Sequence, residues 1–280
     1  MREIHVDQIA ETVARLVQEA NYKLESDVTN ALARATSLEE APVGQAILMQ
    51  IKENYTIAET ERVPMCQDTG VALVFLEIGQ DVHLVGGGLT EAVNRGVAKG
   101  YKEGFLRMSM LNDPIKRVNT RDNTPALIYT ELVPGDQVKV KVDCKGGGSE
   151  NMSQLKMLPP SAGWEGAKRF IVETVANAGP NACPPLIVGV GIGGNFDKSA
   201  LLAKKSLLRH VGDPNSDPDW AAREQELLEE INKLGVGPMG LGGLVTALAV
   251  HIETFGCHIT ALPVAVNIEC HSHRHKEAVL

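Results

Sequence analysis

Apolar residues recur every three or four positions through the first fifth of the chain, which is the spacing of one helix face. This pattern predicts three helices between about residues 5 and 57. Pro42 suits the first turn of the third helix, because a proline there gives up no helical hydrogen bond. The predicted buried positions are Ile9, Val13, Leu16 and Val17, then Val28, Ala31, Leu32 and Ala35, then Val43, Ile47, Leu48 and Ile51.

From about residue 58 onward, short apolar runs alternate with amphipathic segments. Strands are predicted at 72–78, twice within 126–144, at 186–192 and at 262–268, and helices at 90–102, 163–178, 197–210 and 218–234. Residues 138–144 alternate between apolar and polar, so one face of that strand should be buried and the other wet. The expected fold class is α+β, with a helical segment at about 5–57 and a mixed α/β portion at about 58–280. No repeat or linker is evident, so we expect one catalytic domain over residues 1–280.

Composition narrows the classes of function. The chain has 280 residues and a formal net charge of −8, which argues against binding to nucleic acid, because phosphate recognition needs clustered Lys and Arg. No apolar run reaches the ~18–20 residues that span a bilayer, and the N-terminus lacks the apolar stretch of a signal peptide. A cytoplasmic protein is therefore expected. Its five cysteines are then available as reduced thiols, for packing or for a metal.

Three of the cysteines lie in loop-like contexts. They are Cys66 in Pro64-Met-Cys-Gln-Asp-Thr-Gly70, Cys183 in Asn181-Ala-Cys-Pro-Pro185 and Cys270 in Asn267-Ile-Glu-Cys-His271. None belongs to a CxxC pair, so a zinc ribbon is unsupported. Three thiolates from distant loops would leave one iron of a [4Fe–4S] cluster open as a Lewis acid. Buried free cysteine is also a common core residue, and Cys144 and Cys257 are predicted to lie in the core.

The residues around these cysteines carry a family resemblance. The segment 64–70, Gly86-Gly-Gly88, Lys145-Gly-Gly-Gly-Ser149, Ala182-Cys-Pro-Pro185 and the distal Cys270 together resemble the class I fumarase family, which includes L-tartrate dehydratase. The match extends over roughly residues 5–275, in order and with similar spacing. The resemblance implies a [4Fe–4S] cluster held by Cys66, Cys183 and Cys270.

The same resemblance implies roles for five further residues. Gln67, Arg107 and Gly148 would contact the substrate, with Arg107 binding a carboxylate. Asp68 and His258 would form a catalytic pair that holds a proton near the leaving hydroxyl. Ordinary structural roles compete with each assignment: a turn cap for Asp68, an exposed helix position for Arg107 and a core histidine for His258. The three glycines 146–148 are difficult to tell apart from sequence.

The resemblance also implies a partner. Single-chain members of the family continue well past the third cysteine into a second domain, whereas this chain ends at Leu280. It therefore resembles the alpha subunit of the two-subunit form, in which a separate beta subunit supplies that domain, a catalytic threonine and further Arg and Lys. Two alpha and two beta subunits are expected. The implied reaction is the reversible hydration of fumarate to (S)-malate, with L-tartrate dehydration as the alternative.

Two other motifs suggest different functions. Gly189-Val-Gly-Ile-Gly-Gly194 matches the dinucleotide-binding pattern, but a second helix is predicted after the one that follows it, so close packing or tight turns are the favoured interpretation. The tail Cys270-His-Ser-His-Arg-His275 suggests zinc, because imidazole is a common zinc ligand. A solvated chain end is the favoured interpretation of this tail. A non-catalytic metal-binding module and a nucleotide-dependent oxidoreductase remain as alternatives.

Overall fold

The computed structural model describes residues 1–280, which form two compact units assembled from separate stretches of the chain. The first unit contains Met1–Glu25, Asn54–Gly147 and Arg274–Leu280, and the second contains Ser26–Glu53 and Gly148–His273. Helix α3 (Pro42–Glu61) begins in the second unit and ends in the first. The predicted α+β class is confirmed, and none of the helices combines the length and apolar character that crossing a membrane requires.

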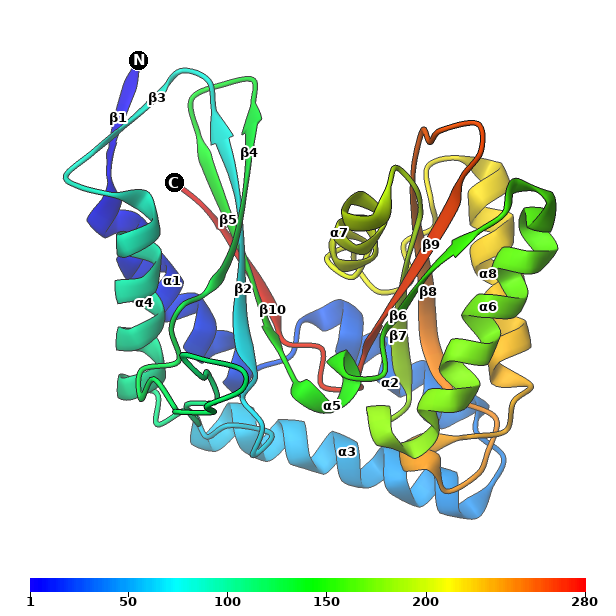
Figure 1. The fold of residues 1–280 in the computed structure, drawn as a ribbon. Coiled ribbons are helices and arrows are strands. Elements are labelled where there is room, and N and C mark those ends of the chain that lie inside the picture. Colours follow the sequence, from blue (N-terminus) through cyan, green and yellow to red (C-terminus); the bar gives the residue numbers. More distant parts are fainter. The chain divides into compact units, whose positions relative to one another are not determined.

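The first unit is built on a four-stranded sheet in the order β10-β5-β2-β4. The strands are β2 (Val71–Gly79), β4 (Leu127–Val133), β5 (Val138–Lys145) and β10 (His275–Val279), and a separate pair joins β1 (Arg2–His5) to β3 (Val82–Val85). Helices α1 (Val6–Tyr22) and α4 (Leu89–Glu103) pack together beside this sheet (Figure 1). The core forms where the apolar faces of both helices meet the inward valines of β5, as the 3.6-residue and 2-residue periods dictate.

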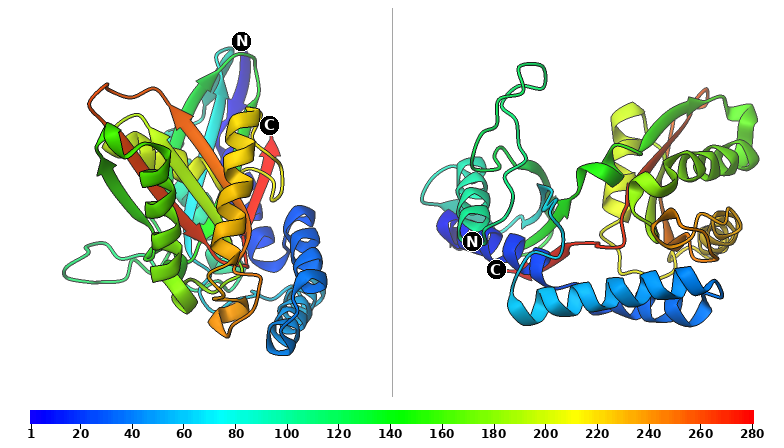
Figure 2. Two further views of the ribbon diagram at one scale, coloured as in Figure 1. Left: turned by 90° about the vertical axis from the view of Figure 1, so that its right-hand side faces the viewer. Right: turned by 90° about the horizontal axis from the view of Figure 1, so that it is seen from below.

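The second unit is built on a four-stranded sheet in the order β6-β9-β7-β8. The strands are β6 (Gln154–Leu158), β7 (Leu186–Gly193), β8 (Ala247–Phe255) and β9 (Leu262–Glu269). Helices α6 (Gly163–Ala178) and α8 (Pro218–Asn232) cover one face and α7 (Phe196–Ser206) the other, which Figure 2 shows in two further views. The remaining helices are α2 (Ser26–Leu38) and the short α5 (Gly147–Glu150). Because helices lie on both sides, all of β7 is buried, which explains its continuous apolar sequence.

The glycines of the 189–194 motif serve the packing of α7. A Cβ on Gly189 would lie 2.3 Å from the Ala203 carbonyl oxygen, and one on Gly191 would lie 2.0 Å from that of Ser199. Both distances are impossible for a real side chain, so glycine alone lets the helix backbone approach the strand. The close-packing interpretation of these two glycines is confirmed. The helix after α7 is α8, as predicted, and only then does β8 pair with β7 in parallel.

Several sequence-based expectations were wrong in detail. The strands β1, β3, β6, β8 and β10 were not predicted. The two strands predicted within 126–144 do form, but β2 lies between them, parallel to β4 and antiparallel to β5. The face of β5 that was expected to be solvent-exposed is buried at the C-terminal end of the strand, where Asp143 is 2% exposed and Lys145 is 1% exposed. Cys144, on the opposite face, lies in the core as predicted.

The interpretation of residues 270–275 as a solvated chain end was also wrong. His273 is fully buried and Arg274 is 1% exposed, because the chain continues from here into strand β10 beside β5. His273 places Nε2 2.8 Å from the Leu207 carbonyl oxygen in the second unit. Arg274, in the first unit, donates to the Asn21 side-chain oxygen at 3.4 Å and to the Asp68 carbonyl oxygen.

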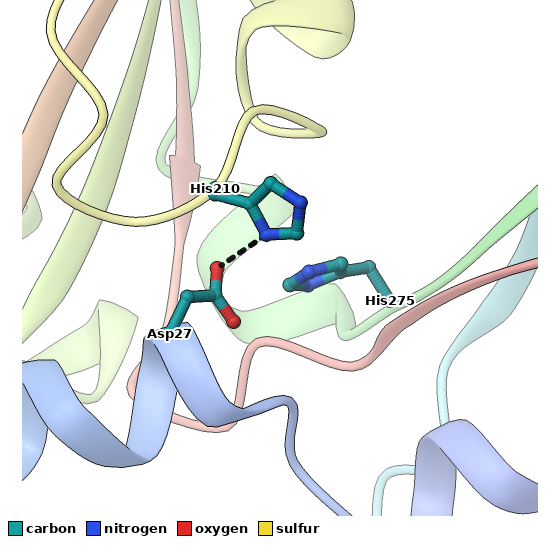
Figure 3. A group of neighbouring side chains, drawn as sticks. All are labelled: Asp27, His210 and His275. Carbon is teal, nitrogen blue, oxygen red and sulfur yellow. Dashed lines mark ion pairs between the residues drawn. The ribbon is translucent and has the colours of Figure 1, made fainter.

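A further polar contact joins distant parts of the second unit. Asp27 in the first turn of α2 lies 3.6 Å from His210 Nδ1, which follows α7 (Figure 3). The same carboxylate accepts a hydrogen bond from the Val211 backbone N–H at 2.7 Å. The Asp27 side chain is 10% exposed, whereas that of His210 is 68% exposed, so the backbone hydrogen bond is the better-shielded contact. Together these contacts fix the start of α2 to the segment after α7.

Candidate active site

Cys183 and Cys270 lie at the same end of one antiparallel strand pair in the second unit. Cys183 precedes β7, Cys270 follows β9, and the register pairs Ile187 with Glu269. The Cys183 carbonyl oxygen accepts a hydrogen bond from the His271 backbone N–H at 3.3 Å and lies 3.0 Å from His271 Nδ1. Both thiols are only partly buried. The fold of this unit therefore brings together two of the three predicted cluster ligands, which are 87 positions apart in the sequence.

Cys66, the third predicted ligand, lies in a loop of the first unit that leads into β2. Its thiol is partly buried and donates to Gln67 Oε1 at 3.7 Å. The neighbouring Asp68 is held by the backbone: Oδ1 accepts from the Gly70 N–H at 3.0 Å and Oδ2 from the Gly147 N–H at 2.8 Å. These contacts fix the Asp68 carboxylate against the glycine turn that follows β5.

Arg107 is placed next to this loop by its backbone. Its carbonyl oxygen accepts a hydrogen bond from Thr69 Oγ1 at 3.0 Å, while its side chain is exposed. Arg107 lies in a loop after α4, so the predicted alternative of an exposed helix position was wrong. The structure thus brings Arg107 together with Gln67 and Asp68 within the first unit, although the sequence separates them by about forty positions. The exposed Arg107 guanidinium can donate the two parallel hydrogen bonds by which an arginine binds a carboxylate.

The glycine turn 146–148 separates the two units along the chain. A Cβ at Gly146 would lie 3.1 Å from the Arg274 guanidinium, and one at Gly148 would lie 3.3 Å from the Asn181 carbonyl oxygen. Gly148 and Gly147 are exposed, whereas Gly146 is buried. The Gly147 N–H already donates to Asp68. Of the three glycines, Gly148 therefore has the backbone most accessible to a ligand.

His258 lies elsewhere in the second unit, in the exposed loop between β8 and β9. Its Nδ1 is 2.8 Å from Thr260 Oγ1, and it is not the core histidine considered as an alternative. Strand β9 has eight residues and ends one residue before Cys270. At about 3.3 Å per residue, the strand alone spans roughly 26 Å. His258 and Cys270 therefore lie at opposite ends of β9.

The two remaining cysteines are poor candidates for cluster ligands. Burial raises the pKa of the Cys144 thiol to about 12, so this residue does not supply a thiolate at neutral pH. The prediction that Cys257 lies in the core was wrong: it is exposed, and its thiol donates to the Ala261 carbonyl oxygen at 3.2 Å. The reason is that β8 ends at Phe255. Cys257 consequently sits at the end of the sheet opposite Cys183.

Comparison with known proteins decides the family. Residues 10–279 match the family described as fumarate hydratase (fumerase). The chain belongs to the fumarase family. It is 44% identical, over 95% of both chains, to a Methanocaldococcus jannaschii protein named provisionally as L(+)-tartrate dehydratase subunit alpha. It is 32% identical to the L(+)-tartrate dehydratase alpha subunit of Escherichia coli, with 96% of this chain and 89% of the relative covered. Members of the fumarase family are hydro-lyases, and this chain is a hydro-lyase of that family.

Sequence reasoning missed some residues that shape the site. Arg274 contacts the Asp68 backbone, yet it was assigned to a solvated end because its neighbours are polar. Thr69 and Tyr101 also position the loop, with the Tyr101 hydroxyl donating to the carbonyl oxygens of Thr69 and Gly70, each at 2.9 Å. The full burial of Tyr101 on the apolar face of α4 is the one signal that helical periodicity could have supplied.

Proposed function

We propose that the chain is the alpha subunit of a fumarate hydratase that interconverts fumarate and (S)-malate with a [4Fe–4S] cluster held by Cys66, Cys183 and Cys270. The observation that carries this proposal is the placement of the partly exposed Cys183 and Cys270 at one end of the β7–β9 pair. The family match over residues 10–279 supports the reaction class.

The thiols present fit such a cluster. Cys66, Cys183 and Cys270 all lie in loops and are partly accessible, whereas Cys144 is sealed in the core. Three thiolates leave one iron of a cubane without a protein ligand. When bound, the cluster would supply a Lewis acid for the substrate hydroxyl.

The remaining roles belong to side chains of this protein. Arg107 would hold one substrate carboxylate with two parallel hydrogen bonds, Gln67 would contact the substrate beside Cys66, and Gly148 would offer its backbone. Asp68, fixed by two backbone N–H donors, would share with His258 the proton that accompanies the hydroxyl. Its rigid placement supports this role, because a proton carrier must stay within hydrogen-bond reach.

Pairing Asp68 with His258 of the same chain conflicts with the cluster as proposed. Asp68 is two residues from Cys66, at most about 7 Å of chain, whereas the whole of β9, roughly 26 Å long, lies between His258 and Cys270. A single cubane shared by Cys66 and Cys270 cannot bridge the difference. We therefore propose that a second alpha chain contributes His258, which is consistent with the exposure of its loop.

Mixing two inactive variants tests this arrangement. One complex carries Cys183→Ser and the other carries His258→Ala, and each should be inactive by itself. When the two are mixed and their alpha chains reassociate at random, about a quarter of the wild-type number of active sites should return. Mixed dimers would then hold one site with both residues intact. If His258 acts within its own chain, every mixed site lacks one residue and no activity returns.

A beta subunit is the proposed partner. Both relatives described above are named as alpha subunits, and this supports a division of the active site between two chains. In the proposal the partner removes the C3 proton and supplies further cationic contacts to the substrate. The assembly would contain two subunits of each kind.

L-tartrate is the second candidate substrate, because the relatives carry that name. It differs from malate by one hydroxyl, which needs an additional polar partner in the site. In the polar segment 120–123, Asp122 accepts from the Thr124 N–H at 2.9 Å, and Asn123 accepts from the Ser109 N–H at 2.7 Å. Because Asp122 Oδ1 and Asn123 Oδ1 already accept hydrogen bonds within the loop, we favour malate.

Steady-state rates of the anaerobic alpha–beta complex test this choice. We expect kcat/KM for (S)-malate to exceed that for L-tartrate by about tenfold or more, and turnover by the alpha chain alone to be negligible. The opposite preference would establish the tartrate alternative. Comparable turnover by the alpha chain without a partner would refute the division of the site.

A further inference from the structure

A partly buried polar network in the second unit joins the glycine turn to the strand that leads to Cys270. Asn267 on β9 donates through Nδ2 to Glu150 Oε2 at 2.7 Å and to Ser153 Oγ at 2.8 Å. Ser153 Oγ in turn accepts from the Ile268 backbone N–H at 3.0 Å. Lys204 from α7 donates to the other Glu150 oxygen at 2.6 Å.

The location of this network links it to two predicted site residues. Glu150 ends α5, two residues after Gly148, and Asn267 lies three residues before Cys270. Asn267 is 5% exposed and sits on a strand between β6 and β7. A carboxamide in the middle of a sheet is costly to bury unless it is hydrogen-bonded.

The network lies at the edge of an open space in the second unit. Glu150, Ser153, Lys204 and Asn267 border a cavity of about 190 Å³. On the side where this space interrupts the packing, the hydrogen bonds of Asn267 supply directional contacts to Glu150 and Ser153.

We propose that Asn267, Glu150 and Ser153 form a positioning network that sets the Gly148 backbone at a fixed place relative to Cys270. The proposal rests on the function proposed above, in which Gly148 contacts the substrate and Cys270 binds the cluster. Lys204 forms an ion pair with Glu150 at 2.6 Å and so offsets the charge of the carboxylate that Asn267 contacts.

Kinetics of the alpha–beta complex test the network. Asn267→Ala should raise KM for (S)-malate about tenfold and leave kcat within about threefold, because a backbone contact present in both ground and transition states contributes uniform binding. The matched control is Asn195→Ala, which removes the N-cap of α7 at the opposite end of β7. It should reduce thermal stability to a similar extent and leave KM unchanged.

A reciprocal exchange separates positioning from folding. Asn267→Asp alone places two carboxylates together and should raise KM at least as much as Asn267→Ala. Adding Glu150→Gln restores a donor and an acceptor with their places exchanged, and KM should return to within about threefold of wild type.

Each outcome decides one claim. A KM within twofold of wild type for Asn267→Ala, or a double variant no better than Asn267→Asp, overturns the network. A wild-type complex without activity on malate or tartrate refutes the proposed function instead, so the two failures are distinguishable.

Discussion

Replacing Cys183 with serine is expected to lower hydro-lyase turnover by about a thousandfold or more, and to remove most of the bound iron. A serine hydroxyl is a much weaker iron ligand than a thiolate, and loss of Lewis-acid stabilisation worth several kcal/mol corresponds to at least three decades in rate. The carbonyl of residue 183 accepts its hydrogen bond from the His271 backbone N–H through the main chain, so the substitution should leave this backbone contact intact. Turnover and iron content should be measured on anaerobically purified complex.

Cys257→Ser is the matched control for this experiment. Cys257 is also a loop cysteine, and it is more exposed than Cys183, but it lies at the other end of the sheet. Its replacement should keep both activity and iron within about twofold of wild type. Equal loss of activity and iron in the two variants would mean that the effect is not specific to Cys183. Full activity in Cys183→Ser would show that Cys183 is not a cluster ligand.

Replacing Arg107 with alanine is expected to lower kcat/KM for (S)-malate by about 10²- to 10³-fold. A charge-assisted, bidentate contact to a carboxylate accounts for a loss of this size, since removing one partner of such a pair typically costs 2–5 kcal/mol. Arg107→Lys should recover only part of the loss, because an ammonium keeps the charge but not the fork.

Arg117→Ala provides the comparison for Arg107. Both arginines are exposed and lie in the segment between α4 and β4. Arg117→Ala removes the same charge from the first unit without touching the Thr69–Arg107 contact, so kcat/KM should stay within about twofold. If both variants lose activity alike, the effect of Arg107 is one of overall charge and not of substrate binding.

Hydrophobic periodicity predicted the helices and strands whose burial follows a regular pattern. The helices α1 and α6 were found because each buries one apolar stripe, and β7 because both its faces are covered. Strands β6 and β10 were missed because their residues are mixed: β6 is a mostly exposed edge strand, and β10 opens with His275, Lys276 and Glu277. Their strand character comes from pairing with β9 and β5, which no local pattern encodes.

The candidate site divides in the same way. Local motifs located Cys66, Cys183 and Cys270, and the loop contexts of all three were as expected. Sequence could not tell that Cys183 and Cys270 meet through the His271 backbone N–H, because that contact depends on the register of β7 with β9. The strand predicted at 262–268 lies between His258 and Cys270 in the sequence, and the structure confirms it as β9, which holds the two residues at opposite ends.

The most direct test of the account is iron and sulfide analysis of the anaerobically purified alpha–beta complex, with spectra recorded before and after addition of (S)-malate. The account predicts about four iron and four sulfide per alpha chain and a malate-dependent change in the spectrum of the cluster. Zinc in place of iron, or a cluster whose spectrum is unaffected by malate, would contradict it.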